Sequence, residues 1–314
     1  MKLIHNKSRP PIDAHVVRLA GGLGNQMFQY AFGQTLRLTM GLPVHYDART
    51  LFDGGRIEGD TLREYALSHL NVDVTFASDH ELDFFGVNYS NGAKTGLKTL
   101  VSNLRTLCGN SRVVEEKGFG YRDDVLSKGH TAKYFSGYWQ SVKYLSGIEE
   151  TIRSEFQPRT DLTTEAKDLK QRIEHLGAAC VNVRRGDFVS DEKTRKFHGY
   201  MDAEYYTSGL KRLRQTGAFD HVFVFSDEPE WCASNLHLPG NIEVVAHRFA
   251  GPHFTHYIHL MASCSGFVIP NSTFGWWGAW LSNVSGNQIV SPRNWFADKS
   301  VDTTDLIPNS WVRL

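Results

Sequence analysis

The sequence predicts an α/β protein made of two Rossmann-like, doubly wound domains that face a cleft. The first observation is that short apolar strands alternate with amphipathic helices along the second half of the chain, which favours a parallel sheet. The second is a strand, a Gly-rich turn and a helix in direct succession near the start. The third is the length of 314 residues with 41% hydrophobic side chains. That length suffices for two domains of about 150 residues each.

In the first half, the clearest predicted element is a helix over residues 25–40. Its apolar residues recur at i, i+3, i+4 and i+8, the spacing of one helical face: Phe28, Ala31, Phe32 and Leu36. The segment 86–112 is rich in Gly, Asn, Lys and Ser, and we expect it to be loop-like or weakly helical. The other predicted elements are a strand at 15–20, a strand at 42–46 and a helix near 143–156, which Pro158 ends.

The second half alternates more regularly. Strands are expected at 181–183, 221–225, 242–245, 266–270 and 288–290. Helices are expected at 202–216, from Pro229 onward, at 254–264 and at 274–281. We place the join near 157–165, so that the domains are 1–160 and 161–314. The last residues are expected to pack back on the first domain.

The composition excludes several classes of protein. Basic and acidic side chains balance at 34 each, so the chain lacks the basic field of a nonspecific nucleic-acid binder. No apolar run is long enough for a transmembrane helix, and the start of the chain lacks the apolar stretch of a signal peptide. The 4 cysteines are scattered, which is typical of buried thiols in a reducing compartment. A cytoplasmic protein is therefore expected.

The turn Gly21-Gly-Leu-Gly-Asn-Gln26 lies between a strand and a helix, the layout of an anion or nucleotide site at a helix N-terminus. It lacks the spacing of a dinucleotide fingerprint and the lysine of a P-loop. A plain tight turn, in which glycine permits positive φ, is the alternative. The amides that follow the glycines favour a ligand, so Gly22 and Asn25 are predicted to contact it.

The stretch Arg184-Arg-Gly-Asp187 follows an apolar strand, and ligands of open α/β sheets bind at strand ends. Guanidinium groups match phosphate with a bidentate fork, so an anionic ligand is predicted here. Because successive strand residues point to opposite faces, we expect one of Arg184 and Arg185 to face the ligand and the other to pair with a carboxylate. Asp187 is either the structural partner of an arginine or a base. A buried ion pair that closes the loop is the alternative.

The stretch Ser226-Asp-Glu228 ends another strand and would open on the same cleft. A carboxylate at Asp227 would either accept hydrogen bonds from the N1–H and N2–H groups of guanine or cap the helix that follows. Both roles remain open at this point, and one residue could serve both.

The stretch Asn271-Ser-Thr-Phe274 ends a further strand. Backbone N–H groups and the hydroxyls of Ser272 and Thr273 would cradle a phosphate without a metal, with an ordinary N-cap as the alternative. Of the adjacent Trp276 and Trp277, at least one should pack in the core, and stacking of the other on a sugar is an alternative to its burial.

Nothing in the sequence favours a metal site. The chain has no Asp-x-Asp and no His-Glu-x-x-His. His253, His256 and His259 recur at i, i+3 and i+6, which is a loose helical ladder rather than a ligand set.

Four stretches together resemble the α-1,2-fucosyltransferases of glycosyltransferase family 11, a mostly bacterial family. The similarity spans about residues 15–296, and the first and last stretches are long and specific. They are Gly21 to Phe32, Gly137-Tyr-Trp-Gln-Ser141, Arg184 to Asp187, and Asn271 to Leu281. The resemblance implies a two-domain, GT-B-like fold and the use of GDP-fucose as co-substrate, with no metal or other cofactor.

The activity that the resemblance implies is an inverting transfer of L-fucose from GDP-β-L-fucose to the 2-hydroxyl of a galactoside in a surface glycan. The N-terminal domain would form the acceptor side, and the C-terminal domain would bind the nucleotide sugar. Arg184 is expected to stabilise the leaving diphosphate, and Asp187 and Glu192 are the candidate bases. The expected donor-binding residues are Gly22, Asn25, Arg184, Arg185, Ser226, Asp227, Asn271, Ser272, Thr273 and Phe274.

Two positions depart from the family's pattern. Asn182 stands where the family usually has a histidine, and Tyr257 stands where it usually has an aspartate. Both border the expected donor pocket, so another GDP-deoxyhexose or nucleotide sugar is an alternative donor. A non-catalytic carbohydrate- or nucleotide-binding relative is a second alternative.

The expected acceptor is a galactose-containing oligosaccharide, for which a lipid-linked glycan at the inner face of the membrane is plausible by resemblance. Lys211, Arg212 and Arg214 would then provide a peripheral membrane contact, or form only the solvated face of a helix.

Overall fold

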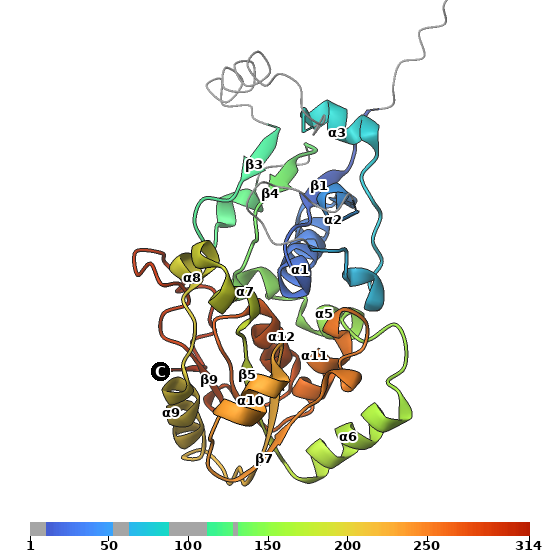
Figure 1. Cartoon of the computed structure of the whole chain (residues 1–314). Coiled ribbons are helices and arrows are strands. Elements are labelled where there is room, and N and C mark those ends of the chain that lie inside the picture. The colour runs from blue at the N-terminus through green and yellow to red at the C-terminus, as the bar shows by residue number, and fades with distance from the viewer. Residues whose placement is uncertain (1–10, 53–62, 88–111, 128–130) are drawn as a thin grey trace, which may run out of the picture.

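The computed structural model describes residues 11–52, 63–87, 112–127 and 131–314. The segment 86–112, predicted to be loop-like or weakly helical, lies, apart from its ends, outside these residues. Two parallel sheets lie one above the other in Figure 1, each accompanied by helices. This is the predicted α/β, GT-B-like architecture of two Rossmann-like halves.

The first sheet has the strand order β2-β1-β4-β3, and all of its pairs are parallel. Its strands are β1 (His15–Arg18), β2 (Val44–Asp47), β3 (Val113–Glu115) and β4 (Tyr134–Ser136). The helices of this half are α1 (Leu23–Met40), α2 (Arg49–Phe52), α3 (Asp79–Phe85) and α5 (Glu149–Glu155). Strands β3 and β4 were not predicted, because three-residue strands show too little alternation to be recognised.

Helix α1 connects the two halves. It begins two residues earlier than predicted, inside the Gly-rich turn, and Gly41 ends it in a left-handed conformation with φ 72°. The predicted apolar face is fully buried. The ring of Phe28 lies 4.7 Å from that of Trp276 and 4.8 Å from that of Trp277. The first and second halves therefore share one continuous hydrophobic core.

The second sheet has the order β10-β9-β8-β5-β6-β7, again with parallel pairs throughout. Its strands are β5 (Ala179–Val183), β6 (His221–Ser226), β7 (Asn241–Val244), β8 (Gly266–Val268), β9 (Ile289–Ser291) and β10 (Val312–Arg313). Its helices are α6 (Thr164–His175), α7 (Gly186–Ser190), α8 (Glu192–His198), α9 (Ala203–Leu213), α10 (Pro229–Asn235), α11 (Thr255–Ala262) and α12 (Thr273–Leu281). The predicted strands and helices of this half are confirmed, most with slightly different ends.

Helix α6 follows the predicted join and was not foreseen. Its N-cap Thr163 accepts a hydrogen bond from the backbone of Ala166 at 3.2 Å. Its buried residues are only Ala166, Leu169 and Ile173, which are spread too thinly among charged residues to give a strong periodic signal.

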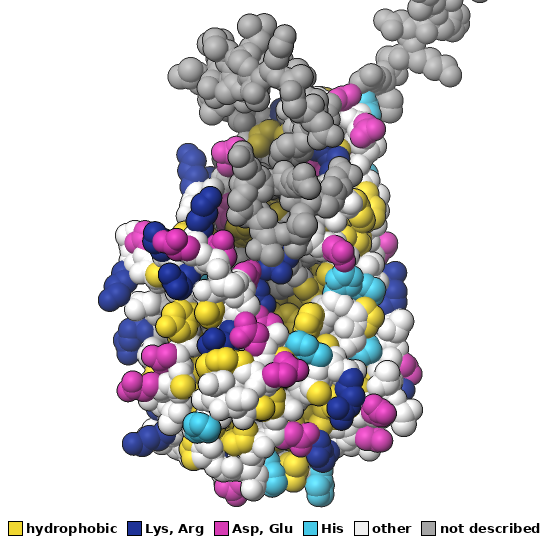
Figure 2. All heavy atoms as spheres, in the orientation of Figure 1, with side chains coloured by type: hydrophobic (Ala, Val, Ile, Leu, Met, Phe, Trp, Pro, Cys, Tyr) yellow, Lys and Arg dark blue, Asp and Glu magenta, His cyan; other side chains and the backbone are white. Residues whose placement is uncertain are grey.

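The C-terminal segment contacts the first half through Asp305. The backbone N–H of Val142 donates to the Asp305 carbonyl at 2.9 Å, and the N–H of Tyr121 donates to its carboxylate at 2.9 Å. Basic and acidic side chains are interspersed on the face that Figure 2 shows, in keeping with their equal numbers.

Candidate active site

The four motif stretches lie at the carboxyl ends of the central strands of both sheets. In the second sheet, β5 leads to β6 on one side and β8 leads to β9 on the other, so the strand order reverses between β5 and β8. Ligands of open α/β sheets bind at such a switch point. Strands β1 and β4 are the central pair of the first sheet. Residues from all four stretches line one pocket of about 720 Å³.

The N-termini of α1 and α12 meet at this pocket. A Cβ atom on Gly24 would lie only 2.6 Å from the carbonyl carbon of Thr273, so only glycine lets the two helices approach so closely. The indole of Trp277 donates to the Gly24 carbonyl at 2.9 Å and holds the contact. Neither N-cap residue, Gly22 or Ser272, makes a side-chain capping bond. Each N-terminus carries a partial positive charge and unpaired N–H groups, which suits an anionic ligand.

Asn25 joins three of the motif stretches. Its Oδ1 atom accepts hydrogen bonds from Gln140 at 3.0 Å and from the Thr273 hydroxyl at 2.9 Å. Its side chain packs directly against Gly21, which has φ +77° and leaves no room for a Cβ atom. Gly22, Asn25 and Thr273 all line the pocket as predicted, and a part-buried hydrogen bond brings Asn25 and Thr273 together across 248 residues.

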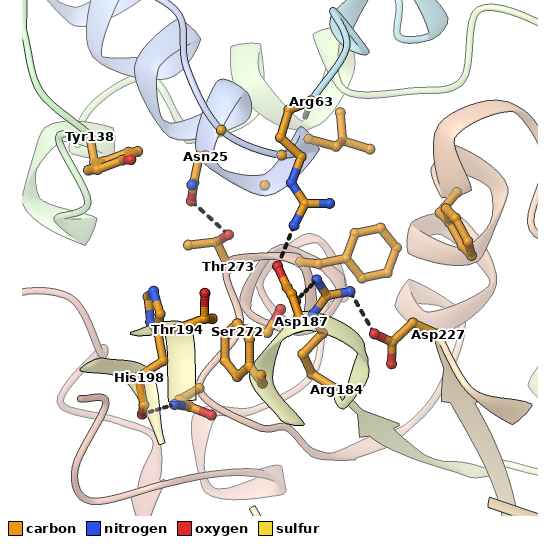
Figure 3. Close-up of a pocket in the computed structure, with 18 of the residues that line it drawn as sticks. Asn25, Arg63, Tyr138, Arg184, Asp187, Thr194, His198, Asp227, Ser272 and Thr273 are labelled. Atoms are coloured by element: carbon orange, nitrogen blue, oxygen red, sulfur yellow. Dashed lines mark hydrogen bonds and ion pairs between the residues drawn. The ribbon is translucent and has the colours of Figure 1, made fainter. Parts of the chain in front are cut away.

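Arg184 lies at the centre of an ion-pair network in the pocket (Figure 3). Its Nη1 atom is 2.7 Å from Asp227 Oδ2, and its Nη2 atom donates to Asp187 Oδ1. The other oxygen of Asp187 accepts from Arg63 Nη2 at 2.6 Å. The two carboxylates therefore fix the position of the Arg184 guanidinium, which keeps further N–H groups for a ligand.

Arg185 and Glu192 do not line the pocket. Arg185 pairs with Glu228 at 3.0 Å, and its guanidinium lies 3.5 Å from the ring centroid of Trp231. Of the two arginines only Arg184 lines the pocket, as expected, but both pair with carboxylates rather than Arg185 alone. Glu192 is exposed in the first turn of α8 and pairs with Lys196 at 2.7 Å. We therefore do not retain Arg185 as a donor contact or Glu192 as a base.

Ser226 and Asp227 line the pocket, but Asp227 does not cap the following helix. The N-cap of α10 is Glu228, without a side-chain capping bond, so the capping alternative is wrong. Asp227 instead accepts from the backbone N–H of Arg185 at 3.0 Å and from the Arg184 side chain. The Ser226 hydroxyl accepts from the Glu228 N–H at 2.9 Å.

Asn271, Ser272 and Phe274 also line the pocket. The Asn271 amide donates to the carbonyls of His198 at 2.6 Å and Trp295 at 3.0 Å, so it holds two segments beside the end of β8. Trp276 and Trp277, by contrast, are both fully buried. The prediction that at least one packs in the core is confirmed, and the alternative of sugar stacking by the other is wrong, because both fill the core that the two halves share.

Asn182 and Tyr257, the two positions that depart from the family's pattern, both make hydrogen bonds to backbone carbonyls. Asn182 donates to the Phe225 carbonyl at 3.0 Å, and its Oδ1 atom lies against Gly275, where a Cβ would clash. The Tyr257 hydroxyl donates to the Val245 carbonyl at 2.7 Å. Both residues line the pocket, and both have a structural hydrogen bond.

Sequence reasoning missed Arg63 and His198 as pocket residues. Arg63 is 124 residues from its partner Asp187, and no local pattern marks it. His198 ends α8 in the pocket, and burial together with nearby Arg184 lowers its pKa, against the opposing effect of Asp187. For His198, the only signal in the sequence was that it directly follows another aromatic residue, Phe197.

Two further histidines, His259 and His253, lie in the core and at the pocket respectively. Burial lowers the pKa of His259 to about 4, with smaller contributions from His256 and Lys170. His253 lies at the pocket and stacks on His69, with ring centroids 4.8 Å apart. Within residues 11–52, 63–87, 112–127 and 131–314, no three His, Cys, Asp or Glu side chains are grouped to hold a metal ion. Nor is any helix in those ranges long and apolar enough to cross a membrane.

Two parallel α/β halves, joined at a pocket that receives a helix N-terminus from each, are the architecture of a GT-B-like glycosyltransferase. The sequence model of glycosyl transferase family 11 matches residues 119–314. An α-1,2-colitosyltransferase of Escherichia coli is 31% identical over 95% of this chain and 98% of its own length. The chain therefore belongs to glycosyl transferase family 11.

Other proteins are also similar to this chain. The O-antigen biosynthesis glycosyltransferase WbnK of Escherichia coli is 28% identical over 94% of this chain and 99% of its own length. A galactoside 2-alpha-L-fucosyltransferase of Caenorhabditis elegans is 29% identical over 56% of this chain and 51% of its own length. Among solved structures, an Arabidopsis thaliana FUT1 mutant with GDP is 12% identical, with a TM-score of 0.47 over 98% of this chain and 78% of that chain.

Proposed function

We propose that this enzyme transfers L-fucose from GDP-β-L-fucose to the 2-hydroxyl of a galactoside, with inversion to an α-1,2 linkage. The observation that carries the proposal is the convergence of two uncapped helix N-termini and Arg184 on one pocket. The names of the relatives support the donor class and the linkage, since they include α-1,2-fucosyl and α-1,2-colitosyl transferases.

In the proposed mechanism, the bond between the sugar C1 and the diphosphate oxygen breaks while the acceptor hydroxyl attacks. Negative charge then grows on the diphosphate, as positive charge does on the sugar ring. Arg184, the N–H groups at the start of α12 and the Ser272 hydroxyl would stabilise that charge. One preorganised donor of this kind contributes about 2.7–4 kcal/mol. Their positions are set before the reaction, because Asp187 and Asp227 already hold Arg184.

We propose a positioning role for Asp187 rather than proton acceptance. Both of its carboxylate oxygens accept hydrogen bonds from guanidinium groups, one from Arg63 and one from Arg184. To accept a proton, Asp187 would have to give up one of these contacts.

The donor nucleotide is proposed to be GDP because the four motif stretches resemble those of α-1,2-fucosyltransferases, a resemblance that implies GDP-fucose as co-substrate. Asp227 lends this part little support, because both of its oxygens already accept hydrogen bonds from Arg184 and Arg185. A GDP-deoxyhexose other than GDP-fucose is the second candidate donor. It is favoured by the similarity to an α-1,2-colitosyltransferase over nearly the whole chain.

The acceptor is proposed to be a galactose-containing glycan of the cell surface, as in O-antigen synthesis, with synthesis in the cytoplasm at the inner face of the membrane. The similarity to WbnK supports this choice. A membrane contact through α9 has less support: the Arg214 guanidinium donates to the carbonyls of Phe219 at 3.0 Å and Pro239 at 2.8 Å. Of Lys211, Arg212 and Arg214, Arg214 therefore has a structural role in holding these two carbonyls.

The test is product-linked turnover. The protein is mixed with GDP-fucose, with other GDP- and UDP-sugars and with a panel of β-galactosides, with EDTA in half of the reactions. We expect release of GDP and a glycan mass increased by one deoxyhexose, equally with and without EDTA. Turnover only with a UDP-sugar, or only with added divalent metal, would contradict the donor class or the metal-independent mechanism respectively.

A further inference from the structure

The pocket has two chemically different sides. In Figure 3, Asp227 lies on one side of the Ser272–Thr273 turn, and His198 and Tyr138 lie on the other. The second side is lined by Phe119, Tyr138, Phe197, His198 and Phe296, and we call it the aromatic side. It combines residues from the first half with residues of α8 and of the C-terminal segment.

The aromatic side presents apolar rings to the solvent of the pocket. Tyr138 is 37% exposed and Phe197 is 43% exposed, although both are large hydrophobic side chains. Phe119 packs on Phe296 with ring centroids 4.6 Å apart, so rings of the two halves form one surface. Exposed rings beside a polar, anion-binding centre suit a ligand with an apolar face and hydroxyl groups, such as a pyranose.

His198 is the titratable group of this surface, and its imidazole is held in place. The ring stacks on Phe188 at 4.8 Å with planes 18° apart, and Phe296 lies 5.5 Å away. The backbone carbonyl of His198 accepts from Asn271. Its Nδ1 atom is buried and has no hydrogen-bond partner within the described ranges. Since the ring lines the pocket and only Nδ1 is buried, Nε2 is the nitrogen that a substrate would reach.

Burial, rather than the charges that face His198, favours its neutral form. Burial is the largest influence and lowers its pKa; Arg184 lowers it further, and Asp187 acts in the opposite direction. A neutral imidazole at physiological pH has a free lone pair for a proton.

The other titratable groups of the pocket are less suited to this task. Asp187 and Asp227 are each held by arginine on both oxygens. Glu64 is 79% exposed at the rim, where it lies 3.6 Å from His253. Among the carboxylates and histidines that line the described part of the pocket, His198 combines an oriented ring, an unpartnered nitrogen and a place beside the aromatic rings.

We propose that the aromatic side binds the acceptor sugar and that His198 accepts the proton of its attacking hydroxyl. This inference rests on the proposed function. The acceptor oxygen forms a bond to C1 of the donor sugar, and the bond between C1 and the diphosphate oxygen breaks. The electron pair of the broken bond leaves with the nucleoside diphosphate. The hydroxyl proton moves to the imidazole, which later releases it to water.

The experiment compares the wild type with His198→Gln, His198→Ala and the control His237→Gln, whose histidine is exposed and does not line the pocket. Each protein is assayed for transfer to a β-galactoside as a function of pH, for GDP affinity by calorimetry and for melting temperature. We expect kcat/KM of His198→Gln to fall by about 10²–10⁴-fold, the usual contribution of a general base. GDP affinity should change by less than about threefold, since the nucleotide contacts other residues.

The pH profile distinguishes a base from a structural residue. Wild-type kcat/KM should decline at acid pH, where His198 becomes protonated, and the His198→Gln profile should lack that limb. Added imidazole should partly restore His198→Ala. If the wild type transfers sugar and His198→Gln transfers it equally well, the role of His198 is refuted and the proposed function stands. Loss of GDP binding in both His198→Gln and His198→Ala would also refute the role of His198 as a base, because the ring would then be needed for the structure of the nucleotide site. A wild type that transfers no sugar would refute both proposals.

Discussion

Replacing Arg184 and Arg185 separately with lysine tests how the pocket uses two adjacent arginines. Arg184 lines the pocket, pairs with Asp227 at 2.7 Å and also pairs with Asp187. Arg185 lies outside the pocket, where it pairs with Glu228 at 3.0 Å. The two substitutions are chemically identical, so any difference in their effects comes from position.

Lysine keeps the charge of Arg184 but cannot span two carboxylates with a planar fork. At least one charge-assisted hydrogen bond is then lost, worth about 1.5–3 kcal/mol when fully buried. Because the Arg184 side chain is 26% exposed, we expect the smaller part of that range, roughly 1–2 kcal/mol, in the free energy of unfolding. Loss of one preorganised donor to the leaving group, about 2.7–4 kcal/mol, should lower kcat by about 10²–10³-fold.

Arg185→Lys should lower the free energy of unfolding by about 1 kcal/mol or less, because its partner Glu228 is 38% exposed. Its kcat should stay within about threefold of the wild type, since a loss of that size does not reach the reacting groups. Initial rates of GDP release at saturating donor and urea unfolding curves measure the two effects. Equal losses of kcat in the two variants would refute the assignment of Arg184 alone to the leaving group.

Three further predictions concern other parts of the molecule. Gly24→Ala places a methyl group 2.6 Å from the start of α12; it should cost about 1–3 kcal/mol in stability and weaken GDP binding in calorimetry, whereas Gly120→Ala, which has open space, should change neither. Because burial lowers the pKa of His259 to about 4, the unfolded chain binds more protons than the folded one between about pH 6.5 and 4. The free energy of unfolding should therefore decrease as the pH is lowered from 6.5 to 4, by up to about 1.4 kcal/mol per pH unit from this group. His259→Leu should make the free energy of unfolding depend less on pH, as measured by urea unfolding at pH 7, 6 and 5. Glu116, whose pKa burial raises to about 7, accepts backbone N–H groups of Tyr138 at 2.6 Å and Trp139 at 2.9 Å. Glu116→Gln has one acceptor oxygen for the two donors, so the melting temperature should fall and the acceptor KM should rise; an unchanged KM would speak against a role of this turn at the acceptor side.

The elements that the sequence predicted well are those with strong local signals. Helix α1 shows a regular apolar stripe, and strands β5, β6 and β8 are buried apolar runs followed by polar turns. Strands β3, β4 and β10 are two or three residues long and were missed. Such short strands are stabilised by pairing with a neighbour, which a linear pattern does not record.

The candidate site divides in the same way. Gly22, Asn25, Arg184, Ser272 and Thr273 were predicted from turn chemistry at strand ends, and all of them line the pocket. Glu192 was selected by its distance along the chain from Asp187. The helical direction of α8 instead places it at the surface with Lys196.

The sequence by itself therefore determined the order of strands and helices and the polar turns at their ends, because periodicity, glycine and small hydroxyl residues act over a few neighbouring positions. Only the tertiary structure decided which side chains share the pocket. The contact of Arg63 with Asp187 spans 124 residues, and that of Asn25 with Thr273 spans 248. These contacts depend on how the two sheets pack through α1 and α12, just as the orientation of α8 decides that His198 lines the pocket and Glu192 does not. Those choices are set by the shared core of the two halves rather than by any local pattern.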